Sequence, residues 1–161
     1  MAIISFEKIA GDVTIAEVPD GFRRLNWDNF LAADAEYLEA RFGITNAVRT
    51  GEAAALNDFG ESAGFESPDR DDDFDLNNGY FTAFDAADLP VNVKVVGFDD
   101  GKKVAAKVLV LDADREFVRF GAQFDDIDEV GFKVKGGTDP APNEAAPFPP
   151  FFLVDDLFID F

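Results

Sequence analysis

The sequence contains no cysteine and no histidine, and these two absences remove several common chemistries. Without cysteine the chain forms no disulfide and has no thiol nucleophile. Without histidine it cannot build a Ser-His-Asp triad, a His-ligated zinc site or a His acid–base pair. We therefore expect a protein that is not an enzyme. The missing cysteine does not decide the cellular compartment, because it is compatible with both cytosolic and exported proteins.

Basic residues are also scarce: 14 Lys and Arg stand against 33 Asp and Glu, for a net charge of −19. Nucleic acid and anionic membrane surfaces are poor partners for such a chain, because both require clustered Lys and Arg. Two interpretations of the excess of acidic residues remain, and they do not exclude each other. The carboxylates can keep the protein soluble, including in salty surroundings, or they can bind a cation such as Ca²⁺.

Long hydrophobic runs are missing as well, so we expect no insertion into a membrane. The first eleven residues, Met1 to Gly11, have neither a basic start nor a long apolar stretch, so they do not resemble a signal peptide.

Phenylalanine, in contrast, occurs 19 times among 161 residues, which suits a single apolar-cored domain over residues 1–161. Aromatic and β-branched residues favour strands. Val91 to Phe98 alternates apolar and polar residues, Asp99 to Gly101 is a hairpin turn signal, and Lys102 to Leu111 is its return strand. Short runs of this kind, separated by turn residues, indicate a sandwich or a barrel.

Other segments are less regular. Asp34 to Phe42 contains helix-forming residues, and Gly43 follows as a stop signal, so we expect at most a short helix or a turn there. The remaining expectations are a strand at a sheet edge at Thr50 to Asn57, a surface loop at Glu61 to Asp73, a turn at Asn77 to Gly79, a loop at Thr138 to Pro150 and a terminal strand at Phe151 to Phe161.

The Asp-rich stretch from Asp69 to Asn78 is the first candidate for cation binding. Asp71, Asp73 and Asp75 alternate as at the start of an EF-hand loop, which then needs Gly at position six and Glu at position twelve. Neither residue falls at the required place when counting starts from Asp71 or from Asp73. A solvated acidic loop is the interpretation that we favour.

Acids near the two chain ends are the second candidate. Asp155 and Asp156 interrupt the apolar terminal strand, and alternation places Asp155 with Leu153, Leu157 and Ile159. One of the two acids must then point toward apolar surroundings, where a carboxylate needs a partner. A calcium ion held by Glu7, Asp155 and Asp156 would supply it. The alternative is that both strand ends are exposed and the acids are solvated.

Aromatic residues with a polar group are the candidates for contact with a ligand. We single out Trp27 and Tyr80, with Asn78 beside Tyr80, because sugar-binding sandwiches use aromatic rings together with amide hydrogen bonds. Trp27 could equally be a core residue. A pair of carboxylates able to hydrolyse a glycoside would arise by chance among so many acids, so the sequence gives no sign of this chemistry.

The order of several short motifs along the chain resembles that of bacterial extracellular β-sandwich modules similar to carbohydrate-binding modules, as found in exported and surface-sorted proteins. In chain order these motifs are FE, GFRRLNWDNF, AAALNDFG, DFDLNNGYFTAF, VNVKVVGFDDGKKV, FDDIDEVGF and FFLVDDLFIDF.

This resemblance implies an all-β jelly-roll sandwich of two antiparallel sheets with at most one or two short helices. It also implies a structural calcium between the first and last strands, with Glu7 and Asp155 at the matching positions. An extracellular or cell-surface location follows from it, as does a glycan or another cell-surface polymer as partner.

We therefore expect a non-catalytic carbohydrate-binding module with a structural calcium. The alternative is a self-assembling surface or filament subunit, whose terminal strand associates with another chain through a free edge. A hydrolase that uses carboxylates alone is a third hypothesis. The sequence does not identify the ligand.

Overall fold

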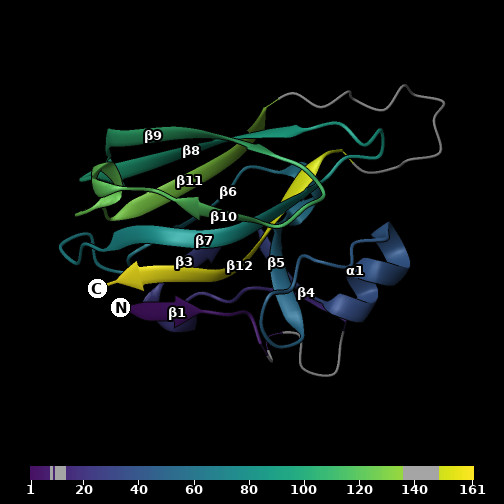
Figure 1. Ribbon diagram of the computed structural model, residues 1–161. Helices are drawn as coiled ribbons and strands as arrows, with labels where there is room; N and C mark the ends of the chain where they lie inside the picture. Colours follow the sequence, from purple (N-terminus) through teal and green to yellow (C-terminus); the bar gives the residue numbers. More distant parts are fainter. Residues whose placement is uncertain (8, 10–13, 136–148) are drawn as a thin grey trace.

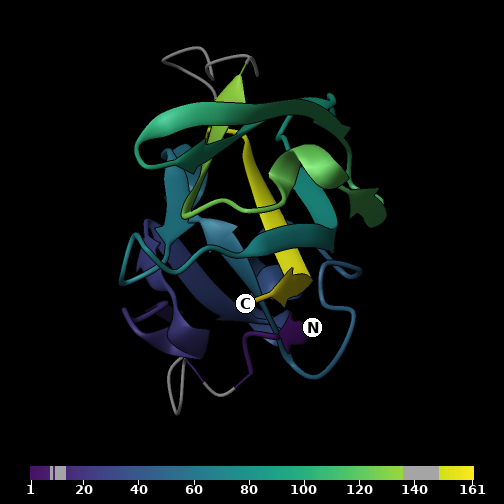
Figure 2. The same ribbon diagram turned by 90° about the vertical axis from the view of Figure 1, so that its left-hand side faces the viewer.

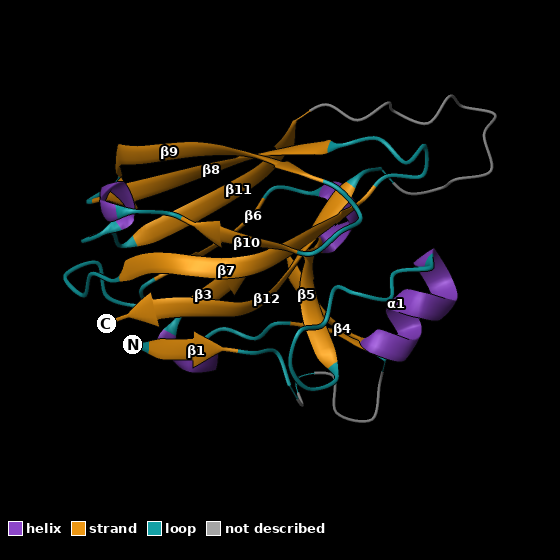
Figure 3. Cartoon of the chain, in the orientation of Figure 1, coloured by secondary structure: helices purple, strands orange, loops and turns teal. Residues whose placement is uncertain are grey.

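The chain folds into a sandwich of two antiparallel β-sheets, as a computed structural model shows for residues 1–7, 9, 14–135 and 149–161 (Figure 1). Within these residues one sheet has seven strands and the other has five. One short α-helix lies beside the strands (Figure 3). The predicted all-β sandwich of two antiparallel sheets is confirmed. No helix in the described residues is long and apolar enough to cross a membrane.

The seven-stranded sheet, here sheet A, has a central path of six strands, with the first strand of the chain paired beside the last. In spatial order these are β10 (Glu116–Arg119), β7 (Asp75–Phe84), β12 (Phe151–Asp160), β5 (Ala53–Asn57), β4 (Phe30–Asp34) and β2 (Ile15–Glu17), while β1 (Ala2–Ile4) also pairs with β12. Sheet B runs in the order β3 (Asn26–Asp28), β6 (Ala63–Glu66), β11 (Glu129–Lys135), β8 (Val91–Asp99) and β9 (Lys102–Leu111).

The hairpin between β8 and β9 forms where the sequence predicts it. Asp99 faces Lys102, and the two residues between them, Asp100 and Gly101, have φ values of 51° and 71°. Two consecutive positive φ angles match the twist of the flanking strands, and Asp-Gly tolerates them at low cost. This local chemistry fixes the register of the longest hairpin in sheet B.

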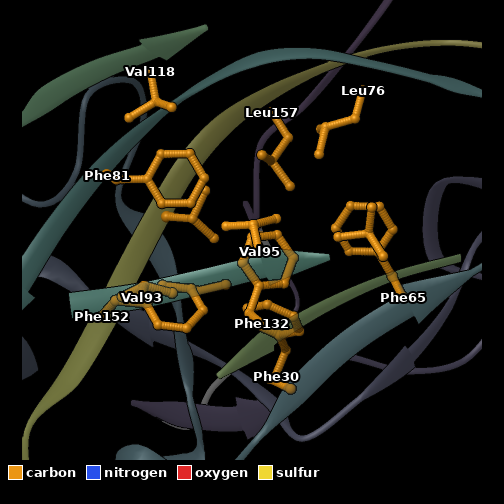
Figure 4. Close-up of a cluster of buried hydrophobic side chains, with 14 of the residues drawn as sticks. Phe30, Phe65, Leu76, Phe81, Val93, Val95, Val118, Phe132, Phe152 and Leu157 are labelled. Atoms are coloured by element: carbon orange, nitrogen blue, oxygen red, sulfur yellow. The ribbon is translucent and has the colours of Figure 1, made fainter. Parts of the chain in front are cut away.

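The main core lies between the sheets and is rich in phenylalanine. Val91, Val93 and Val95 point inward from β8, as their alternation predicts, and are fully buried. They meet Phe81 and Phe152 from sheet A (Figure 4). Such close-packed rings explain how a chain without disulfides stays folded.

A second, smaller core lies on the other face of sheet A. The helix α1 (Ala35–Phe42) packs there and buries Leu38 against Phe151 and Leu153 of β12. The predicted helix and its stop at Gly43 are both confirmed, because Gly43 has φ 71° and its N–H donates to the carbonyl oxygen of Glu39 at 2.8 Å. Strand β12 is therefore covered on both faces, which explains its nearly continuous apolar sequence.

Several predicted boundaries are wrong. The segment Asn77 to Gly79 is not a turn but lies inside the ten-residue strand β7. The predicted loop from Glu61 to Asp73 contains β6. Pairing with distant strands decides these segments, and turn propensity does not. Most of the predicted loop Thr138 to Pro150 lies outside the described residues.

The terminal strand β12 lies inside sheet A, between β7 on one side and β5 and β1 on the other. Strand β5, which we expected at a sheet edge, likewise lies between β12 and β4. Pairing of β1 with β12 brings the two chain ends together (Figures 1 and 2). Because the backbone of β12 is already paired, the predicted self-association through a free terminal strand is wrong for this strand.

Candidate functional site

Asp155 and Asp156 sit at an irregularity in β12. The register against β7 shifts between Asp155 and Phe158, and Asp156 has φ 46°. A residue is thereby inserted into the strand, so Leu157 returns to the main core that Val154 also lines. The predicted grouping of Asp155 with Leu157 and Ile159 is wrong, because simple alternation does not continue through a bulge.

Asp155 is fully buried and accepts hydrogen bonds from three backbone amides. The N–H groups of Arg49 and Thr50 donate to Oδ2 at 2.6 and 3.1 Å, and that of Asp156 donates to Oδ1 at 2.8 Å. Burial raises the pKa of Asp155 to about 6, although the hydrogen bonds from Thr50 and Arg49 oppose this shift. The nearby charge of Asp156 contributes to this rise in pKa.

Asp156 is paired with a cation of the protein itself. Its Oδ2 accepts a hydrogen bond from the guanidinium of Arg49 at 2.7 Å, and its Oδ1 accepts one from the hydroxyl of Thr50 at 2.7 Å. The side chain of Asp156 is only 2% exposed, whereas that of Arg49 is 36% exposed. An ion pair between a buried acid and a partly exposed arginine therefore forms at the bulge in the middle of β12.

Glu7 binds the next part of the same loop. Both carboxylate oxygens accept from the N–H of Glu52, at 3.0 and 2.9 Å, and Oε1 also accepts from Ala53 at 3.3 Å. Gly51, at φ 73°, allows this close approach, since a Cβ there would lie 2.1 Å from the carboxyl carbon of Glu7. The segment Arg49–Ala53, called the clamp loop below, thus holds all three predicted acids.

The three acids do gather at one loop beside the paired chain ends, but N–H groups, a hydroxyl and a guanidinium occupy their oxygens. Among the described residues, no group of three or more acidic side chains is arranged to hold a metal. These acids do not fit a calcium ion in this arrangement, and calcium binding stays a prediction.

Trp27 belongs to the core, which corrects the prediction that it contacts a ligand. It is 7% exposed, and its ring packs against Phe6, Phe30 and Phe65 at centroid distances of 5.5, 5.5 and 4.9 Å. Its indole N–H donates to the carbonyl oxygen of Phe22 at 2.9 Å. Trp27 lines a hollow of about 440 Å³ beside β3, β6 and β11, but its burial leaves little of the ring on which a ligand could stack.

Tyr80 lies on the outer face of sheet A within a cluster of arginines and a second aromatic ring. Its ring centroid is 5.0 Å from that of Phe117, its neighbour on β10. The guanidinium of Arg49 stands over Tyr80 at 4.2 Å, and that of Arg115 is 6.0 Å away. Arg119 stands 5.6 Å from the centroid of Phe117. Cation–π attraction holds these groups together.

Asn78 is next to this cluster. It is two residues from Tyr80 along β7 and faces Arg119 across the pair β7–β10, so it shares the outer face with Tyr80. Its Oδ1 is buried and has no hydrogen-bond partner among the described residues. The structure therefore brings two of the three predicted ligand residues together, through a strand rather than through the predicted turn.

A groove of about 500 Å³ runs between β9 and β10, which are edge strands of sheets B and A. Its accessible lining consists of Lys107, Val108 and Val110 from β9, with Glu116, Phe117 and Arg119 from β10. Phe117 is 44% exposed. The sequence does not distinguish Phe117 from the many other phenylalanines. Phe117 differs from them because it lies on an edge strand.

A larger hollow of about 660 Å³ lies at one end of the sandwich and is lined by Asp85, Asp88, Asp112 and Asp114, among others. Oδ1 of Asp85 accepts from the N–H of Ala87, and Oδ1 of Asp112 accepts from that of Asp114. These two carboxylates therefore stabilise turns. Phe42 and Phe84 also line the hollow, and both are partly buried against the smaller core.

Comparisons with known proteins find similarity in fold, and not in sequence family. No protein-family model matches it, and no curated protein matches it. It is similar to the solved structure of a DUF4465 family protein from Bacteroides ovatus ATCC 8483, with a TM-score of 0.50 and 12% identity over 83% of this chain and 72% of that chain. This likeness shows a shared fold.

A second solved structure, of TmCBM61 in complex with beta-1,4-galactotriose, is similar with a TM-score of 0.39 and 12% identity. The match covers 85% of this chain and 86% of that chain. The chain thus has a distant structural similarity to a carbohydrate-binding module. At this TM-score the likeness says nothing about where a ligand lies.

Proposed function

We propose that this protein is a non-catalytic binding module that holds a carbohydrate chain in the groove between β9 and β10. The observation that carries the proposal is the exposed ring of Phe117, which lies in this groove and is flanked by Arg119 and Lys107. Aromatic faces pack well against the apolar C–H faces of sugar rings, while cationic donors bind hydroxyl groups.

The surroundings of Phe117 suit such a role. Tyr80 packs against one side of it, and Tyr80 is itself held by Arg49, so the exposed ring rests on a fixed support. The groove volume of about 500 Å³ falls within the range of small-molecule sites. An open groove along two strand edges fits an extended chain better than a compact ligand.

Binding without catalysis agrees with the same lining. Hydrolysis of a glycoside by carboxylates requires two acids on either side of the scissile bond, and Glu116 is the single acid lining this groove. A cell-surface or extracellular location belongs to this proposal, because the resemblance implies a cell-surface polymer as the glycan partner.

Phe117→Ala tests the proposal. We expect it to weaken binding in a panel of soluble polysaccharides, measured by calorimetry, by tenfold or more, which corresponds to about 1.4 kcal/mol. Val104→Ala is the matched control, because Val104 is an apolar side chain on β9 that is 51% exposed and does not line the groove. An unchanged affinity in Phe117→Ala, or no binding by the native protein across the panel, would refute the proposal.

A further inference from the structure

The positive charges of this acidic protein are distributed very unevenly. Every lysine of the chain other than Lys8 lies on three neighbouring strands of sheet B. They are Lys94 on β8, Lys102, Lys103 and Lys107 on β9, and Lys133 and Lys135 on β11. Strand β9 itself contains no acidic residue. Strands β8 and β11 contain one acid each, Asp99 and Glu129, so these three strands carry a net positive charge in a chain with a net charge of −19.

These lysines have no carboxylate partner among the described residues, where the ion pairs are Arg49 with Asp156 and the amino terminus with Asp160. Lys94 and Lys133 even face each other directly across the pair β8–β11. Like charges placed opposite each other destabilise a sheet. Folding by itself does not benefit from two lysines placed opposite each other. This arrangement therefore suggests that the positive charge serves binding.

The groove continues this positive surface onto sheet A. Lys107 Nζ donates to the carbonyl oxygen of Arg119 at 2.5 Å and so bridges the two edge strands. Arg115, which precedes Glu116 in the sequence and does not line the groove, donates to the carbonyl oxygens of Asn46 and Val48 at 3.3 and 3.0 Å. Carbonyl acceptors fix the positions of these cations without neutralising them, so the groove keeps a net positive charge beside Glu116.

From this distribution of charge we infer that the ligand is an acidic polysaccharide, with uronate carboxylates along a sugar chain; the inference rests on the proposed function of the groove. Phe117 contacts the sugar ring, and the exposed guanidinium of Arg119 beside it pairs with a carboxylate. A planar guanidinium matches a carboxylate through two parallel hydrogen bonds. The lysines of β8 and β11 extend the contact along the chain.

The overall negative charge opposes the approach of an anionic polymer, so the balance depends on ionic strength. At about 0.15 M salt the Debye length is about 8 Å, which screens the distant carboxylates but not a charge pair in contact. Local cations can therefore bind a polyanion despite the total charge. Binding should be measured at this ionic strength, because at low salt the repulsion extends further.

The experiment compares two polymers that differ only in charge: polygalacturonate and its methyl-esterified, neutral form. By calorimetry at 0.15 M salt we expect at least tenfold tighter binding of polygalacturonate. Equal or tighter binding of the neutral form would overturn the inference and leave the proposed function standing. If neither polymer nor any neutral glycan binds, the proposed function itself fails.

Variants assign the preference to residues. Arg119→Gln should remove the preference for the acidic polymer and keep binding of the neutral one, whereas Phe117→Ala should weaken both. Arg70→Gln, at an exposed arginine of the Asp-rich loop outside the groove, is the matched control and should leave both affinities unchanged. Poly-L-glutamate should bind far more weakly than polygalacturonate; equal binding would mean that the partner is an acidic protein and would overturn the inference.

Discussion

The clamp loop and the open edge formed by β9 and β10 use the same kinds of charged side chain in opposite ways. At the clamp loop, Arg49 is paired with a buried carboxylate and the other predicted acids accept backbone hydrogen bonds. At the open edge, Lys107 and Arg119 are held only by carbonyl oxygens or by an aromatic ring.

This difference separates charges that hold the fold together from charges that are free to meet a ligand. A charged side chain that is already in a buried ion pair binds a ligand weakly, because breaking the ion pair costs more free energy than the new contact provides. A charge held without neutralisation keeps its electrostatic attraction for an anion. The two regions should therefore respond to mutation in different measurements.

Replacing Arg49 tests the first region and should have the largest effect. Arg49→Met leaves the carboxylate of Asp156 buried without its cation, and we expect a larger loss in the free energy of unfolding than for any of the other variants. Urea denaturation measures it. Arg119→Gln, the control from the open edge, should change this free energy by less than about 0.5 kcal/mol. Similar losses in both variants would contradict the comparison.

The buried Asp155 should make stability depend on pH. Its pKa in the folded protein, about 6, lies above the ordinary value of 3.8. The folded state therefore holds the proton more tightly, so this group contributes fully below about pH 4 and loses its contribution as pH rises through about 6. We expect a loss of about 2–3 kcal/mol from this group between these limits.

The variant Asp155→Asn isolates this contribution from that of the other acids. The difference in unfolding free energy between native protein and variant, measured by urea denaturation from pH 4 to 7, should change by the amount given above. A difference that stays constant over this range would show that Asp155 does not titrate there.

Replacing one lysine of sheet B by an acid should change the free energy of unfolding by a smaller amount, and in the stabilising direction. Lys133→Glu replaces the repulsion between Lys133 and Lys94 by attraction, and we expect stabilisation by about 0.2–1 kcal/mol. Thermal denaturation at low and high salt measures it, because salt should weaken the gain. Destabilisation by this variant would mean that the two lysines do not repel each other in the native sheet.

Removal of calcium should have the smallest effect. Because protein donors occupy the oxygens of Glu7, Asp155 and Asp156, a chelator should leave the melting temperature unchanged. A drop in melting temperature that added Ca²⁺ reverses would instead support the calcium site predicted from the sequence. By linkage, a site at 100 times its dissociation constant contributes about 2.7 kcal/mol, which is easily measured.

Features that depend on neighbouring residues could be predicted from the sequence. The hairpin at Asp100-Gly101 and the end of α1 at Gly43 both follow from the φ angles that these residues tolerate. The alternation of Val91, Val93 and Val95 identified a core face, and the recurrence of short apolar runs identified the sandwich. Each of these features is decided within about ten residues.

The tertiary structure alone decided which charges are paired and which aromatic rings are exposed. Asp155 and Asp156 receive their partners, Arg49 and Thr50, from a loop more than a hundred residues away in the sequence. Trp27 became a core residue and Phe117 an exposed one through the positions of their strands, since β3 packs over the main core and β10 forms an edge. The sequence by itself determined that the chain forms two sheets around an apolar core and that it carries an excess of acidic residues. The positions of the few cations were decided by strand pairing between segments that are far apart in the sequence.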